Sequence, residues 1–170
     1  MNAFHYQNRE LCVEDIPLAH IAEQYGTPCY VYAESALTQA YSAYSNAFAG
    51  MPHLVCYALK ANSNLSVVRH FASLGAGFDT VSIGEIERVL AAGGEAGKIV
   101  FSGVGKSAAE MRRALEIGIH CFNVESVNEL ERLNNVAGEL GKRAPVSLRI
   151  NPNVERQGYT LIPLALYWKN

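Results

Sequence analysis

Apolar and polar positions follow two different periods along most of this chain. Short apolar runs of the kind found in buried strands occupy residues 54–59, 77–81, 98–101, 119–124 and 145–150. Between them lie helix-length segments with one apolar face, preceded by a similar segment at 34–48. This alternation predicts a parallel sheet with helices packed against it.

Serine residues mark the predicted starts of three helices. Ser82, Ser107 and Ser126 are each followed by a glutamate three positions later. A serine at the first cap position and a glutamate three residues on can satisfy the free backbone N–H groups of a helix start. The spacing therefore predicts helices beginning just after each serine.

Polar residues recur where the predicted strands end, at a spacing of about twenty to twenty-five residues, as repeated βα units produce. The carboxyl ends of parallel strands meet at one edge of a sheet, so we expect these side chains to converge there. The alternative is that they are simply polar loop residues. The set comprises Lys60, Asp79, Ser102, Asn123, Glu125, Arg149 and Asn151.

Lys60 ends the first of these apolar strands. A lysine held away from water has a lowered pKa and becomes a nucleophile that can form a Schiff base with an aldehyde. A lysine at a strand end is more often a solvated surface group, so this residue needs the surrounding pattern to indicate catalysis.

Composition narrows the functional classes. The 170 residues are 49% hydrophobic and 18% charged, with a formal net charge of −2, as in a soluble globular protein. No basic cluster suggests nucleic acid, and no apolar run could span a membrane. Residues 1–15 do not resemble a secretory signal, so a cytoplasmic location is expected. The four cysteines form no metal-binding pattern and are interpreted as small core residues.

Several segments together resemble one enzyme family. The segment Tyr57-Ala58-Leu59-Lys60-Ala61-Asn62 is similar to the pyridoxal-phosphate attachment signature of the ornithine/diaminopimelate/arginine decarboxylases, which are alanine-racemase-like barrel enzymes. Residues 101–106 and 122–126 most resemble the diaminopimelate branch, and residues 149–153 continue the match. The resemblance covers about residues 10–154.

The resemblance implies a cofactor, pyridoxal 5'-phosphate, and the residues that bind it. Lys60 would bind the cofactor covalently, and Asp79 would help to position that amine. Glu85 matches a second acid, although a role as the capping partner of Ser82 fits it equally well. Arg149 matches an arginine close to the cofactor ring, with a solvated surface arginine as the alternative.

For three further residues near the expected site, the sequence allows more than one role. Lys106 stands beside Ser107 and could reach an anion at that helix start, but an exposed loop lysine is the preferred interpretation. Asn123 and Glu125 could shape the pocket mouth, and their positions suit a helix start equally well.

The function implied by the resemblance is that of a lyase: pyridoxal-phosphate-dependent decarboxylation of meso-2,6-diaminopimelate to L-lysine in lysine biosynthesis. Family members are homodimers, and no metal, nucleic acid or membrane is expected to take part. Two alternatives remain. One is another enzyme on the same barrel, such as an ornithine- or arginine-type decarboxylase or a racemase. The other is a non-catalytic pyridoxal-phosphate-binding or regulatory protein.

The resemblance also predicts an incomplete fold. About five parallel strands are expected, whereas a (β/α)8 TIM barrel has eight, so residues 1–154 would be the N-terminal part of the cofactor-binding barrel domain. Residues 155–170 form an atypical tail, which a reading-frame change or premature stop would explain. The family's C-terminal β domain is expected to be absent. With an unpaired sheet edge, the isolated chain is expected to be an inactive, poorly soluble fragment.

Overall fold

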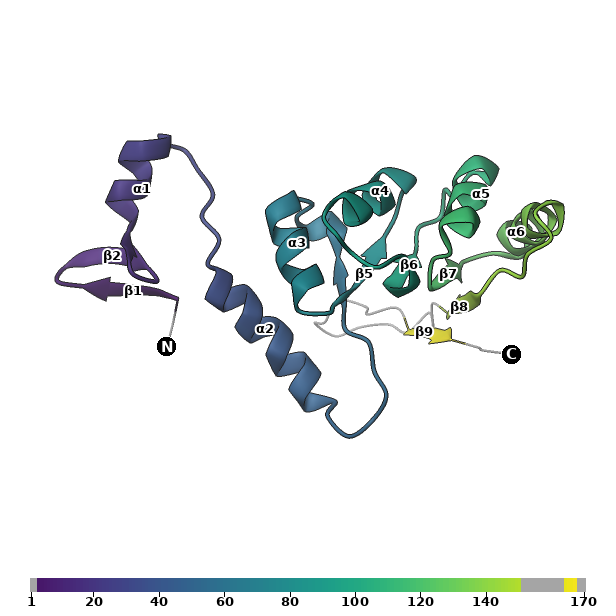
Figure 1. Ribbon diagram of the computed structural model, residues 1–170, viewed down its shortest axis with the longest axis horizontal. Coiled ribbons are helices and arrows are strands. Elements are labelled where there is room, and N and C mark those ends of the chain that lie inside the picture. Colours follow the sequence, from purple (N-terminus) through teal and green to yellow (C-terminus); the bar gives the residue numbers. More distant parts are fainter. Residues whose placement is uncertain (1–2, 151–163, 168–170) are drawn as a thin grey trace, which may run out of the picture. The chain divides into compact units, whose positions relative to one another are not determined.

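The computed structural model describes the backbone of residues 3–150 and 164–167, and the side chains of residues 3–150. The chain divides into two compact units, Met1–Val55 and Cys56–Asn170. Each unit contains a sheet of its own (Figure 1). No linker or shift in composition marks this division in the sequence.

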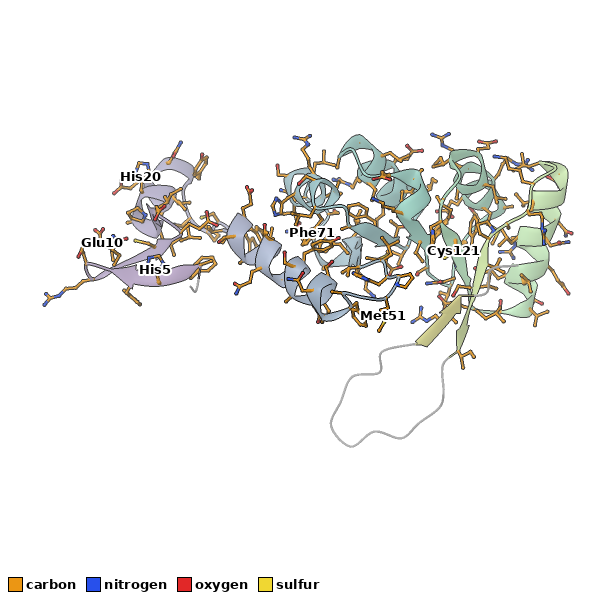
Figure 2. All side chains as sticks on the ribbon, turned by 60° about the horizontal axis from the view of Figure 1, so that its bottom comes forward. His5, Glu10, His20, Met51, Phe71 and Cys121 are labelled. Atoms are coloured by element: carbon orange, nitrogen blue, oxygen red, sulfur yellow. The ribbon has the colours of Figure 1, made fainter. Side chains whose placement is uncertain are left out.

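The first unit contains a small antiparallel sheet that the sequence analysis did not predict. Its hairpin turns at Asn8 and Arg9, which both have positive φ angles, 51° and 69°, as a tight two-residue turn requires. His5 and Glu10 lie on this sheet and His20 on the helix after it (Figure 2). The elements are β1 Phe4–Gln7, β2 Glu10–Val13, β3 Ile16–Pro17, α1 Leu18–Tyr25 and α2 Glu34–Ala47, and the predicted helix at 34–48 is confirmed by α2.

The second unit confirms the predicted βα alternation. Five strands pair in parallel and in chain order, and the helices that connect them lie on one face of the sheet (Figure 1). The strands are β4 Cys56–Ala58, β5 Gly77–Thr80, β6 Ile99–Phe101, β7 Cys121–Val124 and β8 Val146–Ile150. The helices are α3 Leu65–Ser73, α4 Ile83–Ala91, α5 Ala108–Ile117 and α6 Val127–Glu139.

In the second unit, the strand β9 was also not predicted. β9, Leu164–Tyr167, pairs antiparallel with β8, so the sheet of the described residues has six strands and ends at β4 and β9. The free N–H and C=O groups of an edge strand favour such pairing with any further extended segment. The rest of the predicted tail, residues 155–163 and 168–170, lies outside the described residues.

The three predicted helix caps are present. Ser82, Ser107 and Ser126 each accept a hydrogen bond from the backbone N–H three residues later. Only Ser107 forms the full reciprocal box, in which the Glu110 carboxylate also accepts its backbone N–H at 3.0 Å. These caps fix where each helix leaves the loop that follows its strand.

The core lies between the sheet and its helices. Phe78, Phe101 and Phe122, from three neighbouring strands, are fully buried. The rings of Phe101 and Phe122 are 6.0 Å apart between centroids. The buried helix residues Val68, Ile86, Val89, Met111 and Leu133 complete this core. In the described part of the chain, no helix is long and apolar enough to cross a membrane.

Gly94 provides a test of this packing. A Cβ atom at Gly94 would lie 2.4 Å from Val89 Cγ1 and 3.0 Å from Phe78 Cε2. We therefore expect Gly94→Ala to lower the free energy of unfolding by about 1–3 kcal/mol, because the buried core has to shift. Gly97→Ala is the matched control, since a Cβ there meets nothing within 4 Å. Equal unfolding free energies for the two variants in urea titrations would contradict this packing.

Candidate active site

The strand register decides which side chains share the sheet face that the helices leave open. Paired residues in parallel strands point to the same side, and side chains alternate along each strand. The register aligns Asp79 with Val100, Val100 with Cys121, and Asn123 with Ser147. Asp79, Asn123 and Arg149 therefore project from one face, near the carboxyl ends of their strands.

Three of the predicted polar residues form a continuous hydrogen-bonded chain. The Ser102 hydroxyl donates to Asp79 Oδ1 at 2.5 Å, and Asn123 Nδ2 donates to the Ser102 oxygen at 2.9 Å. This Asp79–Ser102–Asn123 chain crosses from β5 to β7. The convergence predicted from the sequence is confirmed for these residues, although the sequence did not show that they bond to one another.

Arg149 and Glu125 form a second polar group. Arg149 Nη1 lies 3.0 Å from Glu125 Oε1, and their side chains are 33% and 18% exposed. Arg149 is thus partly buried and ion-paired, which argues against the alternative of a freely solvated arginine. The guanidinium retains other N–H donors for a ligand.

Contacts of Tyr57 on the helix-covered face of the sheet stabilise the turn that carries Lys60. The Tyr57 hydroxyl donates to the Asn62 carbonyl oxygen at 2.9 Å, which spans the 3-10 turn Leu59–Ala61. The Tyr57 ring also stacks on Phe71, with centroids 4.3 Å apart. Figure 2 shows Phe71 on α3. An apolar contact and one hydrogen bond thus fix the backbone on both sides of Lys60.

The Lys60 side chain itself is exposed. Among the described residues its amine makes no hydrogen bond or ion pair. Of the two interpretations given for Lys60, the described residues therefore favour the solvated lysine over an amine held away from water. Lys60 nevertheless lies near Asp79 along the sheet. Ala58 is paired with Asp79, and Lys60 comes two residues after Ala58.

Glu85 lies at the start of α4. Its Oε2 atom accepts the Val81 backbone N–H at 2.7 Å, while its own N–H donates to Ser82 Oγ at 3.2 Å. Both contacts stabilise the helix start, so they favour the capping interpretation over a cofactor role.

The expectation that Lys106 is an exposed loop lysine is wrong. Instead of lying exposed in its loop, it is only 3% exposed. Its ammonium donates to Gly103 O at 2.6 Å, Asn123 O at 2.8 Å and Glu129 Oε1 at 2.6 Å. Its direct neighbours Gly105 and Ser107 gave no indication of burial, and the glutamate partner was interpreted only as a capping residue.

Two thiols lie close to Asp79. Burial raises the pKa of Cys56 to about 11, and the Asp79 carboxylate adds to the effect. Burial also raises the pKa of Cys121 to about 11, and electrostatic interaction with Cys56 and Asp79 adds to the effect. Figure 2 shows Cys121 on β7. All four cysteines are free, but Cys29 is exposed, so the core interpretation is wrong there. No metal-binding group of three or more His, Cys, Asp or Glu side chains occurs among the described residues.

These pKa values predict the order of thiol alkylation. A thiol with a pKa of about 11 has about one thiolate per thousand molecules near pH 8, and only the thiolate reacts. We expect iodoacetamide to modify exposed Cys29 first, and Cys56 and Cys121 to react faster as the pH rises toward 11. Peptide mapping of alkylation from about pH 7 to 11 measures this. Rapid modification of Cys56 at neutral pH would contradict it.

A family model matches most of the chain. Residues 34–164 match the description "Pyridoxal-dependent decarboxylase, pyridoxal binding domain". The matched segment contains every residue of the candidate site.

Curated relatives extend the likeness to nearly the whole sequence. The diaminopimelate decarboxylase of Pseudomonas aeruginosa is 60% identical over 166 residues, which make up 98% of this chain and 40% of the relative. That of Vibrio cholerae is 56% identical over 167 residues, again 98% of this chain and 40% of the relative. The chain thus spans about 40% of the length of the curated relatives it matches.

A solved structure shows the same fold. The diaminopimelate decarboxylase of Helicobacter pylori, complexed with L-lysine, has a TM-score of 0.78 and 48% identity, covering 81% of this chain and 35% of that protein. A sequence identity of 48% indicates common ancestry as well as a common fold. With the matching family model and the polar edge of a parallel βα sheet, it leads to one conclusion: this chain belongs to the pyridoxal-dependent decarboxylases, and its residues 34–164 match the pyridoxal-binding domain of that family.

Proposed function

We propose that Lys60 binds pyridoxal 5'-phosphate covalently, and that the protein containing this chain decarboxylates meso-2,6-diaminopimelate to L-lysine. The main support is the 60% identity to a diaminopimelate decarboxylase over almost the whole chain. The L-lysine in the complex of the Helicobacter pylori relative agrees with lysine as the product. In the same whole protein we propose further βα units that complete the barrel, a homodimeric assembly and a cytoplasmic location.

The residues at the sheet edge fit such a cofactor chemically. Lys60 offers an exposed amine, the group that reacts with the cofactor's aldehyde. Asp79 and Arg149 supply a carboxylate and a guanidinium on one face of the same sheet. These groups suit the polar substituents of a pyridoxal ring, and they come from strands whose helices hold them in place.

In this proposal, Lys60 binds the cofactor, and Asp79 and Arg149 orient it. When bound, the cofactor withdraws electrons from the substrate carbon that loses carbon dioxide. Lys60 supplies the attachment point, and the Tyr57–Asn62 hydrogen bond limits where its backbone can move. Asp79, held by the Ser102 hydroxyl, presents its other carboxylate oxygen to an amine at this edge. Arg149 is oriented by Glu125 and brings a positive charge to the same face.

Reductive trapping tests the role of Lys60. Treating the chain with pyridoxal 5'-phosphate and then sodium borohydride is expected to place the label on Lys60, because its amine is exposed and has no partner among the described residues. Lys60→Ala should lose that label. Exposed Lys142 serves as an internal control for unspecific labelling, and buried Lys106 should stay unlabelled. A label that saturates on another lysine first would refute the assignment.

The substrate is tested in the protein that the complete gene encodes. We expect it to release L-lysine from meso-diaminopimelate with a kcat/KM at least about a hundredfold above that for ornithine or arginine, because a site built around a second amino-acid group rejects analogues that lack it. Lys60→Ala should abolish turnover. Preference for ornithine would favour the other decarboxylase interpretation. Cofactor binding with no turnover of any of these amino acids would favour a non-catalytic protein.

A further inference from the structure

We propose that Lys106, through its buried pair with Glu129, is the residue that positions both polar groups of the candidate site. These groups are the Asp79–Ser102–Asn123 chain and the Glu125–Arg149 ion pair. The positioning itself is independent of the cofactor, and only its effect on Lys60 chemistry rests on the function proposed above.

The Lys106 ammonium joins three separate parts of the fold. It has three N–H donors, and each has an acceptor: Gly103 O in the loop after β6, Asn123 O in β7, and a Glu129 carboxylate oxygen in α6. It also lies 5.6 Å from the centroid of the Phe101 ring. The loop after one strand is thereby tied to the end of the next.

Glu129 extends this connection by one residue. Its Oε1 atom binds Lys106 at 2.6 Å, and its Oε2 atom accepts the Glu125 backbone N–H at 3.0 Å. The pair therefore holds the backbone of Asn123 and that of Glu125, on either side of Val124. Asn123 carries the end of one polar group, and Glu125 carries the anion of the other.

The position of Asn123 decides the geometry of Asp79. Asn123 Nδ2 donates to Ser102 Oγ, which leaves the Ser102 hydroxyl proton for Asp79 Oδ1. A shift of the β7 end would change this order of donors and acceptors. Lys106 thus acts on Asp79 through two intermediate residues and does not itself touch the reacting groups.

Stability and positioning can be separated by mutation. Removing one member of a buried ion pair leaves an unpaired charge and is strongly destabilising, whereas replacing both members by apolar residues is often neutral. An apolar pair, however, cannot hold the Asn123 carbonyl or the Glu125 N–H. The double variant Lys106→Met/Glu129→Met should therefore remain folded but lose the positioning.

The experiment compares this double variant with Lys98→Met/Glu95→Met in the full 170-residue chain. Lys98 and Glu95 also form a lysine–glutamate pair, at 2.7 Å, but on the surface. Three readouts are needed: the melting temperature, the NMR resonances of the Asn123 side-chain amide, and the rate constant of borohydride-trapped pyridoxal 5'-phosphate attachment at Lys60.

For the double variant we expect a melting temperature close to that of the unmodified chain, shifted Asn123 amide resonances and a roughly tenfold slower attachment at Lys60, a loss comparable to that seen when supporting residues of a site are changed. The surface control should show none of these changes in resonance or rate. Adding Ser102→Ala to the double variant should slow attachment no further, since both changes break the same chain.

Unchanged Asn123 resonances in the double variant, or an effect of Ser102→Ala that adds fully to it, would overturn the proposal. If neither the unmodified chain nor the protein that the complete gene encodes attaches the cofactor at Lys60, the proposed function fails, and the Asn123 resonances still decide the positioning role. If the double variant unfolds, Glu129→Gln replaces it. This variant keeps an oxygen for Lys106 but turns an NH2 group toward the Glu125 N–H. It should speed hydrogen exchange at the Glu125 amide, and unchanged exchange would overturn the proposal.

Discussion

The parallel register of β4 to β8 is the constraint on which the rest of the structure depends. A slip of one residue in β5 or β7 would turn its Asp79 or Asn123 side chain toward the helices and its phenylalanine toward the open face. In the observed register, Phe78, Phe101 and Phe122 are buried, and burial of such rings is worth several kcal/mol, roughly 1.5–3 each. The apolar core therefore determines which face carries Asp79 and Arg149.

The turns after β5 and β7 share one hydrogen-bonding arrangement. Glu85 and Glu129 each stand three residues after a capping serine, and each accepts the backbone N–H of the residue just before that serine. Glu110 instead forms the reciprocal box and also reaches the Ile83 N–H at 3.2 Å. One sequence spacing thus produces two geometries. In the turn of α6 the same carboxylate also holds the buried Lys106 ammonium.

Local pattern was sufficient for most elements of the second unit. Its strands and helices were predictable because apolar periodicity, glycine after α5 and the capping serines all agree. The sheet of the first unit was missed because its strands are short and largely exposed, so no apolar alternation marks them. β9 was missed because an antiparallel return to an open edge follows from tertiary contact and not from the segment itself.

For the candidate site, the sequence predicted position better than contact. Chain spacing indicated that Asp79, Ser102, Asn123 and Arg149 meet at one edge, which follows from the repeat alone. It could not show that Ser102 links Asp79 to Asn123, nor that Lys106 is buried, because both depend on contacts between residues at least 17 positions apart.

A structure of the borohydride-reduced protein, with the pyridoxyl group fixed by reduction, tests the central claim most directly. The register of the sheet predicts that this group is attached to Lys60 and lies on the open face, in contact with Asp79 and Arg149. A pyridoxyl group on the helix side of the sheet, or one that contacts neither of these residues, would contradict the account.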